Sequence, residues 1–272
     1  MAALIGLALL GLALVAASFR FAWWRPRVPE EYPRVLMYHM VREAIPGARF
    51  NKLRVPPAMF AKQVAWLKEN GWHFAFLSEL GHDDLPPKTV AITFDDGYRD
   101  NLLAAQPILA EHGAKATLFL VMDRHDVDWS VARKAHHDEG ELMGEEKLSD
   151  PEVMQMLASG LWEIGAHTIS HSPLPSLDQG PRRAEIVGGR EALEGKFSVR
   201  VQSFAYPFGI FDDQDVELVR EAGYAFAVTT EPGISRDLKA EALRLKRVKV
   251  SGFEGMFAFR LRMSTGHRGA TG

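Results

Sequence analysis

Two aspartates and two histidines form the pattern in this chain that has the clearest chemical meaning. Asp95 and Asp96 lie in the run Thr93–Gly97, and His167 and His171 follow with three residues between them. One carboxylate and two imidazoles make a set of three protein ligands that leaves a coordination position open for water and substrate, as catalytic zinc sites require. A structural zinc site would be closed, and the chain has no cysteine to close it. The pattern therefore predicts a metal-dependent hydrolase.

Both pairs are predicted to follow short buried strands. The β-rich run 89–94 precedes Asp95, and the run 161–166 precedes His167. Ligands bind at the carboxyl ends of parallel strands in α/β folds, so residues at these positions are placed for chemistry. The spacing of His167 and His171 predicts a helical turn with both imidazoles on one face. Taken singly, an acidic pair also fits a helix cap and paired histidines fit a polar surface, but their joint occurrence favours the metal site.

The rest of the chain alternates short β-rich runs with helical patterns. The helical patterns at 57–70 and 100–112 each stop at a glycine. Alternating strands and helices predict a parallel sheet, and seven or eight units favour an α/β fold of the deformed (β/α)7 barrel type, with an open doubly wound sheet as the alternative. The β-rich runs are 35–38, 73–76, 90–94, 116–121, 162–166, 202–206, 225–229 and 245–248.

Three motifs resemble those of the polysaccharide deacetylase family, which is carbohydrate esterase family four with its NodB-like domain. They are Thr93–Gly97, His167–His171 and Tyr206–Gly209, in the family's order. The likeness spans the chain from Arg34 to Val250. The resemblance implies a hydrolase that removes N-acetyl groups from an amino-sugar-containing glycan or glycolipid.

The resemblance also implies a role for each matching residue. Asp96, His167 and His171 would bind a divalent metal, for which zinc is the expected ion, and Asp95 would be the general base. The backbone N–H of Phe208 would hold the oxyanion of the tetrahedral intermediate.

The sequence departs from the family pattern at two places. The third motif commonly begins with an arginine that pairs with the base, but Ala205 stands there, which leaves open how Asp95 is tuned. The family usually keeps its general acid, a histidine, at the end of a late strand, whereas the last histidine here is His267 in the C-terminal tail. His39 ends the early strand 34–41 instead, which resembles family members that act on exported poly-N-acetylglucosamine and have this strand permuted to the front. We assign the general acid to His39; the alternative is a core histidine at a strand end.

Other candidate substrate contacts are aromatic. Trp129 lies in a long charged stretch between Met122 and Pro151 and is expected to stack on a sugar ring. Tyr206 and Phe208 are expected to wall the groove, although packing explains them equally well. The same stretch holds two adjacent histidines that fit a solvated loop better than a second metal site: His136 and His137.

Composition fits one catalytic domain at 34–254, preceded by a linker at 20–33 and followed by a flexible tail at 255–272. The 272 residues are 47% hydrophobic and 25% charged, enough to bury a full core. A net charge of -3 argues against a nucleic-acid partner, which would require clustered cations. The expected partners are a carbohydrate substrate and a membrane.

The membrane expectation comes from the first residues. The stretch 2–18 is apolar throughout, and two tryptophans follow at 23–24, where a membrane interface would hold them. We therefore predict a single-pass anchor at 1–19 in a bacterial inner membrane, with a cleaved signal peptide or a helix docked on the domain as alternatives. Arg20, Arg25 and Arg27 directly follow the stretch, and this charge asymmetry favours a cytoplasmic catalytic domain over a periplasmic one.

Two other functions stay open at this stage. One is a deformylase or amidase that acts on a lipid-linked amino sugar or a small amide. The other is a catalytically weakened carbohydrate-binding module, which the missing arginine would favour and the intact set of aspartates and histidines would not.

Overall fold

The strands form a closed parallel barrel in the computed structural model, which describes residues 1–126, 140–267 and 269. β1 pairs with both β3 and β8, so the eight-stranded sheet closes on itself, while β2 pairs only with the first half of β3. The ring therefore contains seven strands, as predicted, and the open sheet is excluded. The strands are β1 (Arg34–Tyr38), β2 (His73–Ala75), β3 (Thr89–Asp95), β4 (Ala116–Leu120), β5 (Trp162–Ala166), β6 (Ser203–Ala205), β7 (Phe226–Pro232) and β8 (Leu245–Lys249).

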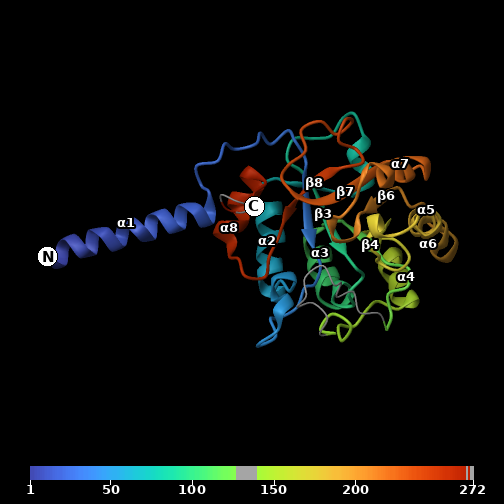
Figure 1. Ribbon diagram of the computed structural model, residues 1–272, viewed down its shortest axis with the longest axis horizontal. Helices are drawn as coiled ribbons and strands as arrows, with labels where there is room; N and C mark the ends of the chain where they lie inside the picture. The colour runs from blue at the N-terminus through green and yellow to red at the C-terminus, as the bar shows by residue number, and fades with distance from the viewer. Residues whose placement is uncertain (127–139, 268, 270–272) are drawn as a thin grey trace.

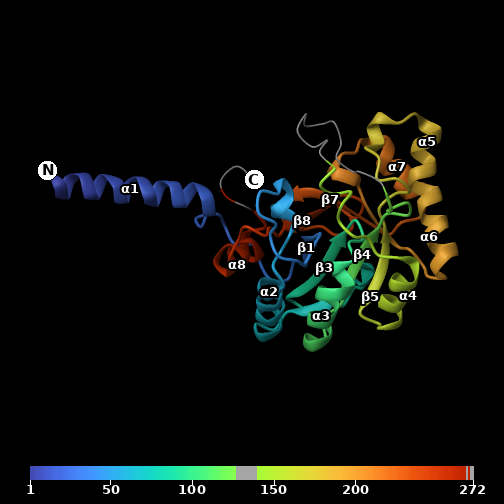
Figure 2. The same ribbon diagram turned by 90° about the horizontal axis from the view of Figure 1, so that it is seen from below.

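Helices surround the barrel (Figure 1, Figure 2). α2 shows why: Pro57 stands in its first turn, and Phe60, Val64 and Leu67 form one buried stripe that packs on the strands. The others are α3 (Gln106–His112), α4 (Asp150–Ala158), α5 (Gln179–Arg183), α6 (Gly189–Phe197), α7 (Asp213–Glu221) and α8 (Met256–Thr265), with α2 itself at Pro57–Glu69. Short helical turns lie at 49–53, 77–81, 101–105, 174–176, 184–188 and 207–209.

The alternation of side chains along β3 places Asp95 inside the barrel. Every residue of β3 is buried, and Ala91 packs with Phe119, Val228 and other inward side chains in a separate inner cluster. Because successive side chains point to opposite faces, Asp95 shares the inward face with Ala91 and lies at the carboxyl end of the strand. The Asp95 carboxylate therefore lies at one open end of the barrel.

The expectation of a flexible tail at 255–272 is wrong for its first part. Met256–Thr265 forms α8, which buries Phe259 and Met263, one helical turn apart, and ends at Gly266 with a φ of 78°. The ring of Phe259 also meets the ring of Trp66 on α2, with 5.9 Å between the centroids. Arg260 and Arg262 lie between these apolar residues and obscured the helical pattern in the sequence.

The N-terminal segment forms helix α1 (Ala2–Phe21), which projects from the barrel in both views (Figure 1, Figure 2). Its last turn contacts α8, with 5.2 Å between the ring centroids of Phe21 and Phe257. Within the described part of the chain, no helix combines the length and the apolar character that crossing a membrane requires. The predicted membrane-spanning anchor is therefore not confirmed.

Candidate active site

Asp95 and Asp96 face the barrel mouth because the chain turns sharply after β3. Asp96 and Gly97 both have a φ of 80°, in the left-handed region that only glycine adopts freely. A side chain at Gly97 would also collide with Leu120, whose Cδ1 lies 2.6 Å from the ideal Cβ position. The glycine permits the turn, and the turn presents two adjacent carboxylates to one pocket.

The structure brings the three predicted ligands together. Oδ1 of Asp96 lies 3.4 Å from Nε2 of His167 and 3.4 Å from Nε2 of His171. Nδ1 of His167 lies 2.7 Å from the carbonyl oxygen of Ala205, so this nitrogen donates its proton and leaves Nε2 free to bind a metal. All three side chains are buried, and their ligand atoms lie within 4.8 Å of one another. One carboxylate oxygen and two imidazole nitrogens are a donor set that fits a divalent ion such as zinc.

The ionisation states also suit a metal. Burial acts to raise the pKa of the Asp96 carboxyl, but the adjacent imidazoles of His167 and His171 outweigh it and hold that pKa well below its ordinary value. Burial lowers the pKa of the His171 imidazole, against the opposing effect of Asp96. A carboxylate and a neutral imidazole are the forms that coordinate metals.

The predicted helical turn at His167–His171 is wrong, because Thr168 and His171 have φ values of 68° and 59°. The loop is held instead by Glu185, whose carboxylate accepts the N–H groups of Ile169 and Ser170, each at 2.9 Å. The Thr168 hydroxyl oxygen also accepts the His171 N–H at 3.0 Å. Sequence reasoning missed Glu185, since it lies on the helical segment between β5 and β6 and no spacing links it to the loop.

An arginine does pair with Asp95, but from another strand. Arg247 on β8 donates from Nη1 to Oδ1 at 2.7 Å and from Nη2 to Oδ2 at 2.8 Å, and its Nε donates to the Thr229 carbonyl at 2.8 Å. The guanidinium is 0% exposed. Arg247 was not predicted from the sequence, because the family motif places its arginine at the position that Ala205 occupies here. One signal in the sequence could have identified Arg247. It is a charged residue on the same face as Leu245, in a strand that was predicted to be buried.

This arginine keeps Asp95 ionised. Burial alone would raise the pKa of the Asp95 carboxyl, but the charge of Arg247, followed by that of His39, brings the net pKa below its ordinary value. The bidentate geometry also fixes the plane of the carboxylate. Asp95 is therefore a buried, ionised carboxylate of fixed orientation beside the three metal-binding candidates.

His39 lies opposite Asp95. Tyr38 pairs with Phe94 in the β1–β3 register, so the next residues of the two strands face each other, with 3.9 Å between Nε2 of His39 and Oδ2 of Asp95. The imidazole is 18% exposed and lines the pocket, which is unlike a histidine packed in the core. The side-chain amide of Asn101 donates to the His39 carbonyl at 2.9 Å and holds this segment in place.

The pocket at the barrel mouth has a volume of about 180 Å³. The Phe208 ring contacts His171, with 4.4 Å between the ring centroids, and forms part of the wall as predicted. Tyr206 also borders the pocket, but its ring stacks on Phe211 and its hydroxyl donates to the Leu243 carbonyl at 3.0 Å, so packing explains it better. The remaining wall comes from Phe50, Lys52, Leu53, Leu142 and Thr230.

Trp129, His136 and His137 lie outside the described residues. His267 lines a different cavity on the barrel's flank.

A family model described as polysaccharide deacetylase matches residues 82–227, more than half of the chain. The matched range contains Asp95, Asp96, His167 and His171. It begins after His39 and ends before Arg247.

Individual proteins agree with this match. YxkH of Bacillus subtilis, named as a polysaccharide deacetylase, is 32% identical over 236 residues, which cover 85% of this chain and 75% of YxkH. A poly-beta-1,6-N-acetyl-D-glucosamine N-deacetylase of Staphylococcus aureus is 23% identical over 218 residues, which cover 72% of this chain and 71% of that protein. The crystal structure of BC0361, a polysaccharide deacetylase from Bacillus cereus, superposes with a TM-score of 0.73 at 28% identity, covering 86% of this chain and 70% of that one.

Proposed function

The chain belongs to the polysaccharide deacetylase family, and from this premise we propose that it removes N-acetyl groups from an amino sugar in a glycan or glycolipid. The observation that carries the proposal is the cluster of Asp96, His167 and His171 in the same pocket as Asp95. The Staphylococcus aureus relative, named for its action on poly-N-acetylglucosamine, supports an N-acetylated sugar as the substrate.

Asp96, His167 and His171 would hold a divalent ion, and we propose zinc because two imidazoles and a carboxylate are its usual catalytic ligands. When bound, such an ion polarises the acyl carbonyl and lowers the pKa of water. The Ala205 carbonyl and Glu185 hold the two histidines in the required orientation.

The protein's own groups move the protons. Asp95, held as a carboxylate by Arg247, accepts a proton from the attacking water. The backbone N–H of Phe208 stabilises the tetrahedral oxyanion. His39, whose Nε2 lies 3.9 Å from Oδ2 of Asp95, then protonates the departing amine.

Arg247 also bears on the alternative of a weakened carbohydrate-binding module. That alternative drew its support from the absence of an arginine at position 205, and Arg247 supplies the missing guanidinium from β8. A binding module has no use for a carboxylate that a buried arginine keeps ionised beside an open metal-binding set.

The location of the protein stays a prediction from the sequence: attachment to a bacterial inner membrane through residues 1–19, with the catalytic domain in the cytoplasm. A reporter fused at the C-terminus tests the side. Reporter activity only in the periplasm would contradict the prediction and direct the substrate search to exported polysaccharide.

The experiment for the activity uses the purified full chain, loaded with zinc, and a panel of N-acetylated glycans and lipid-linked sugars. The proposal predicts free amine and acetate in equal amounts from at least one N-acetyl sugar. Release of formate from N-formyl sugars, with no acetate from any N-acetyl sugar, would establish the deformylase alternative instead.

A further inference from the structure

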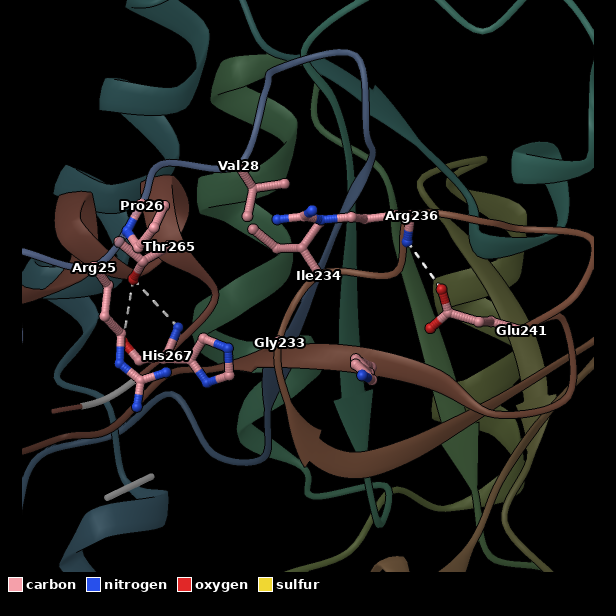
Figure 3. A pocket seen from close by; sticks show the side chains of 10 residues that line it. Arg25, Pro26, Val28, Gly233, Ile234, Arg236, Glu241, Thr265 and His267 are labelled. Carbon is pink, nitrogen blue, oxygen red and sulfur yellow. Dashed lines mark hydrogen bonds between the residues drawn. The ribbon is translucent and has the colours of Figure 1, made fainter. Parts of the chain in front are cut away.

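A second cavity, of about 320 Å³, lies on the outer flank of the barrel (Figure 3). Its walls come from the segment after α1, the connection from β7 to β8, β8 itself and the end of α8. Lys246 lines it, whereas the next residue, Arg247, faces the barrel interior, because adjacent side chains of a strand point to opposite faces. None of the residues that line this cavity lines the pocket with Asp95.

The cavity carries an excess of positive charge. Two guanidinium groups and an ammonium group border it, from Arg25, Arg236 and Lys246, and His267 adds an imidazole. Among the described lining residues Glu241 is the one acid. Its Oε1 already accepts the N–H of Arg236 at 2.9 Å, and Figure 3 shows the carboxylate turned toward that backbone.

Lys246 has an acidic neighbour that does not cancel its charge inside the cavity. Its Nζ lies 3.2 Å from Oε1 of Glu231, but the two side chains are 37% and 59% exposed. Exposed ion pairs are weak because water screens them, so Lys246 is available to a better partner.

The walls of the cavity are fixed by buried contacts. The Val28 N–H donates to the Ser264 carbonyl at 2.7 Å, and the guanidinium of Arg34 donates to the Val28 carbonyl at 2.7 Å and to the Met263 carbonyl at 2.9 Å. These bonds tie the segment after α1 to α8. Gly266 allows the end of α8 to approach the β7–β8 connection, because a Cβ there would lie 2.8 Å from Gly233.

We propose that this cavity binds a phosphate-bearing ligand. Guanidinium groups offer planar pairs of donors that match phosphate oxygens, and charge-assisted hydrogen bonds of this kind are stronger than neutral ones. Val28 and Ile234 add an apolar floor, visible beside the Arg236 side chain in Figure 3, which suits a ligand with a carbon backbone next to its phosphate. The ligand is either the headgroup of an anionic phospholipid or a soluble phosphate compound.

The first arm of the test measures binding of inorganic phosphate to the full chain by calorimetric titration at constant ionic strength. The variant Arg236→Gln/Lys246→Gln removes two cations from the cavity. The control Arg200→Gln/Lys239→Gln removes the same charge from exposed positions outside it, with Lys239 93% exposed. We expect saturable binding that weakens by at least ~10-fold in the cavity variant and by less than about twofold in the control.

The second arm separates the two sources of phosphate. The same proteins are sedimented with vesicles of phosphatidylglycerol and of phosphatidylcholine, and α1 is present in each, so its contribution is the same throughout. A preference for phosphatidylglycerol that only the cavity variant loses identifies a lipid headgroup, and saturable phosphate binding without that preference identifies a soluble ligand.

Two results would overturn the proposal. One is the absence of both saturable phosphate binding and a phosphatidylglycerol preference in the unmodified chain. The other is an equal loss in the cavity variant and the control, which would reduce the effect to net charge. Should the double variant unfold, Arg236→Gln alone keeps the test valid, since the side chain of Arg236 is exposed. Neither arm measures deacetylation, so failure of the proposed activity leaves this test untouched.

Discussion

The ion pair between Arg247 and Asp95 gives the sharpest prediction about the architecture of the site. Arg247→Met removes a guanidinium that is 0% exposed and that makes two hydrogen bonds, at 2.7 Å and 2.8 Å, to a buried carboxylate. The methionine occupies part of the same volume but leaves the charge of Asp95 buried and unpaired. Breaking a buried pair in this way costs about 3–5 kcal/mol, whereas an exposed pair costs about 0–1 kcal/mol.

The assay is urea unfolding of the full chain, with a double-mutant cycle that adds Asp95→Asn. The double variant Arg247→Met/Asp95→Asn buries no unpaired charge, so we expect it to be more stable than Arg247→Met alone. Arg182→Met is a matched control, because Arg182 is also buried and pairs with Asp212 at 2.9 Å, but outside the pocket. It should lower stability without lowering kcat of the folded enzyme at saturating metal.

Arg247→Met should instead lower both stability and kcat, with bound metal unchanged, and Arg247→Lys should restore part of each. A free-energy loss of less than about 1 kcal/mol in Arg247→Met would contradict a strong buried ion pair, since it would mean that water screens the pair. Additive effects of the two substitutions would contradict it equally, because the cycle would then contain no coupling.

Three further predictions concern single residues. Asp95→Asn should keep the metal and lower kcat by at least ~10²-fold, because it removes the proton acceptor; loss of the metal instead would show that Asp95 is a ligand. His39→Ala should impair hydrolysis of an N-acetyl sugar far more than that of an activated aryl acetate, whose leaving group needs no proton, and equal losses would indicate a structural role. Burial, opposed by the Val41 N–H, raises the pKa of Asp100 from 3.8 to about 6. The folded state then binds the proton more tightly, so unfolding free energy should fall by ~2 kcal/mol between pH 4 and pH 6, and Asp100→Asn, which still accepts that N–H, should flatten this fall; an unchanged slope by urea titration would contradict it.

Features of the molecule that rest on local signals were predictable from the sequence. Each strand of the barrel was marked by its own β-rich run, and the alternation of strands and helices determined that the sheet is parallel. Asp96, His167 and His171 were recognisable because each lies within five residues after such a run, and the closed sheet brings the strand ends together.

Features that depend on long-range contacts were not predictable in the same way. Arg247 lies 152 positions from Asp95 in the sequence, and only closure of the barrel makes the two adjacent. The loop at 167–171 was predicted as a helical turn because its positive φ angles are stabilised by Glu185, which belongs to a later helical segment. α8 was missed because the buried stripe of Phe259 and Met263 can be recognised only from its contacts with the rest of the core, such as that of Phe259 with Trp66 on α2.

If Asp96, His167 and His171 form one catalytic metal site, bound metal and turnover should both depend on His167, and His167→Ala measures this dependence. His125→Ala serves as the control, since His125 is exposed and lies outside the pocket. The unmodified chain and the control should each bind one equivalent of zinc by elemental analysis and release acetate from an N-acetylated glycan. We expect His167→Ala to lose both properties while its circular dichroism spectrum is unchanged. Full metal occupancy or undiminished acetate release in that variant would show that these three residues do not form the catalytic metal site.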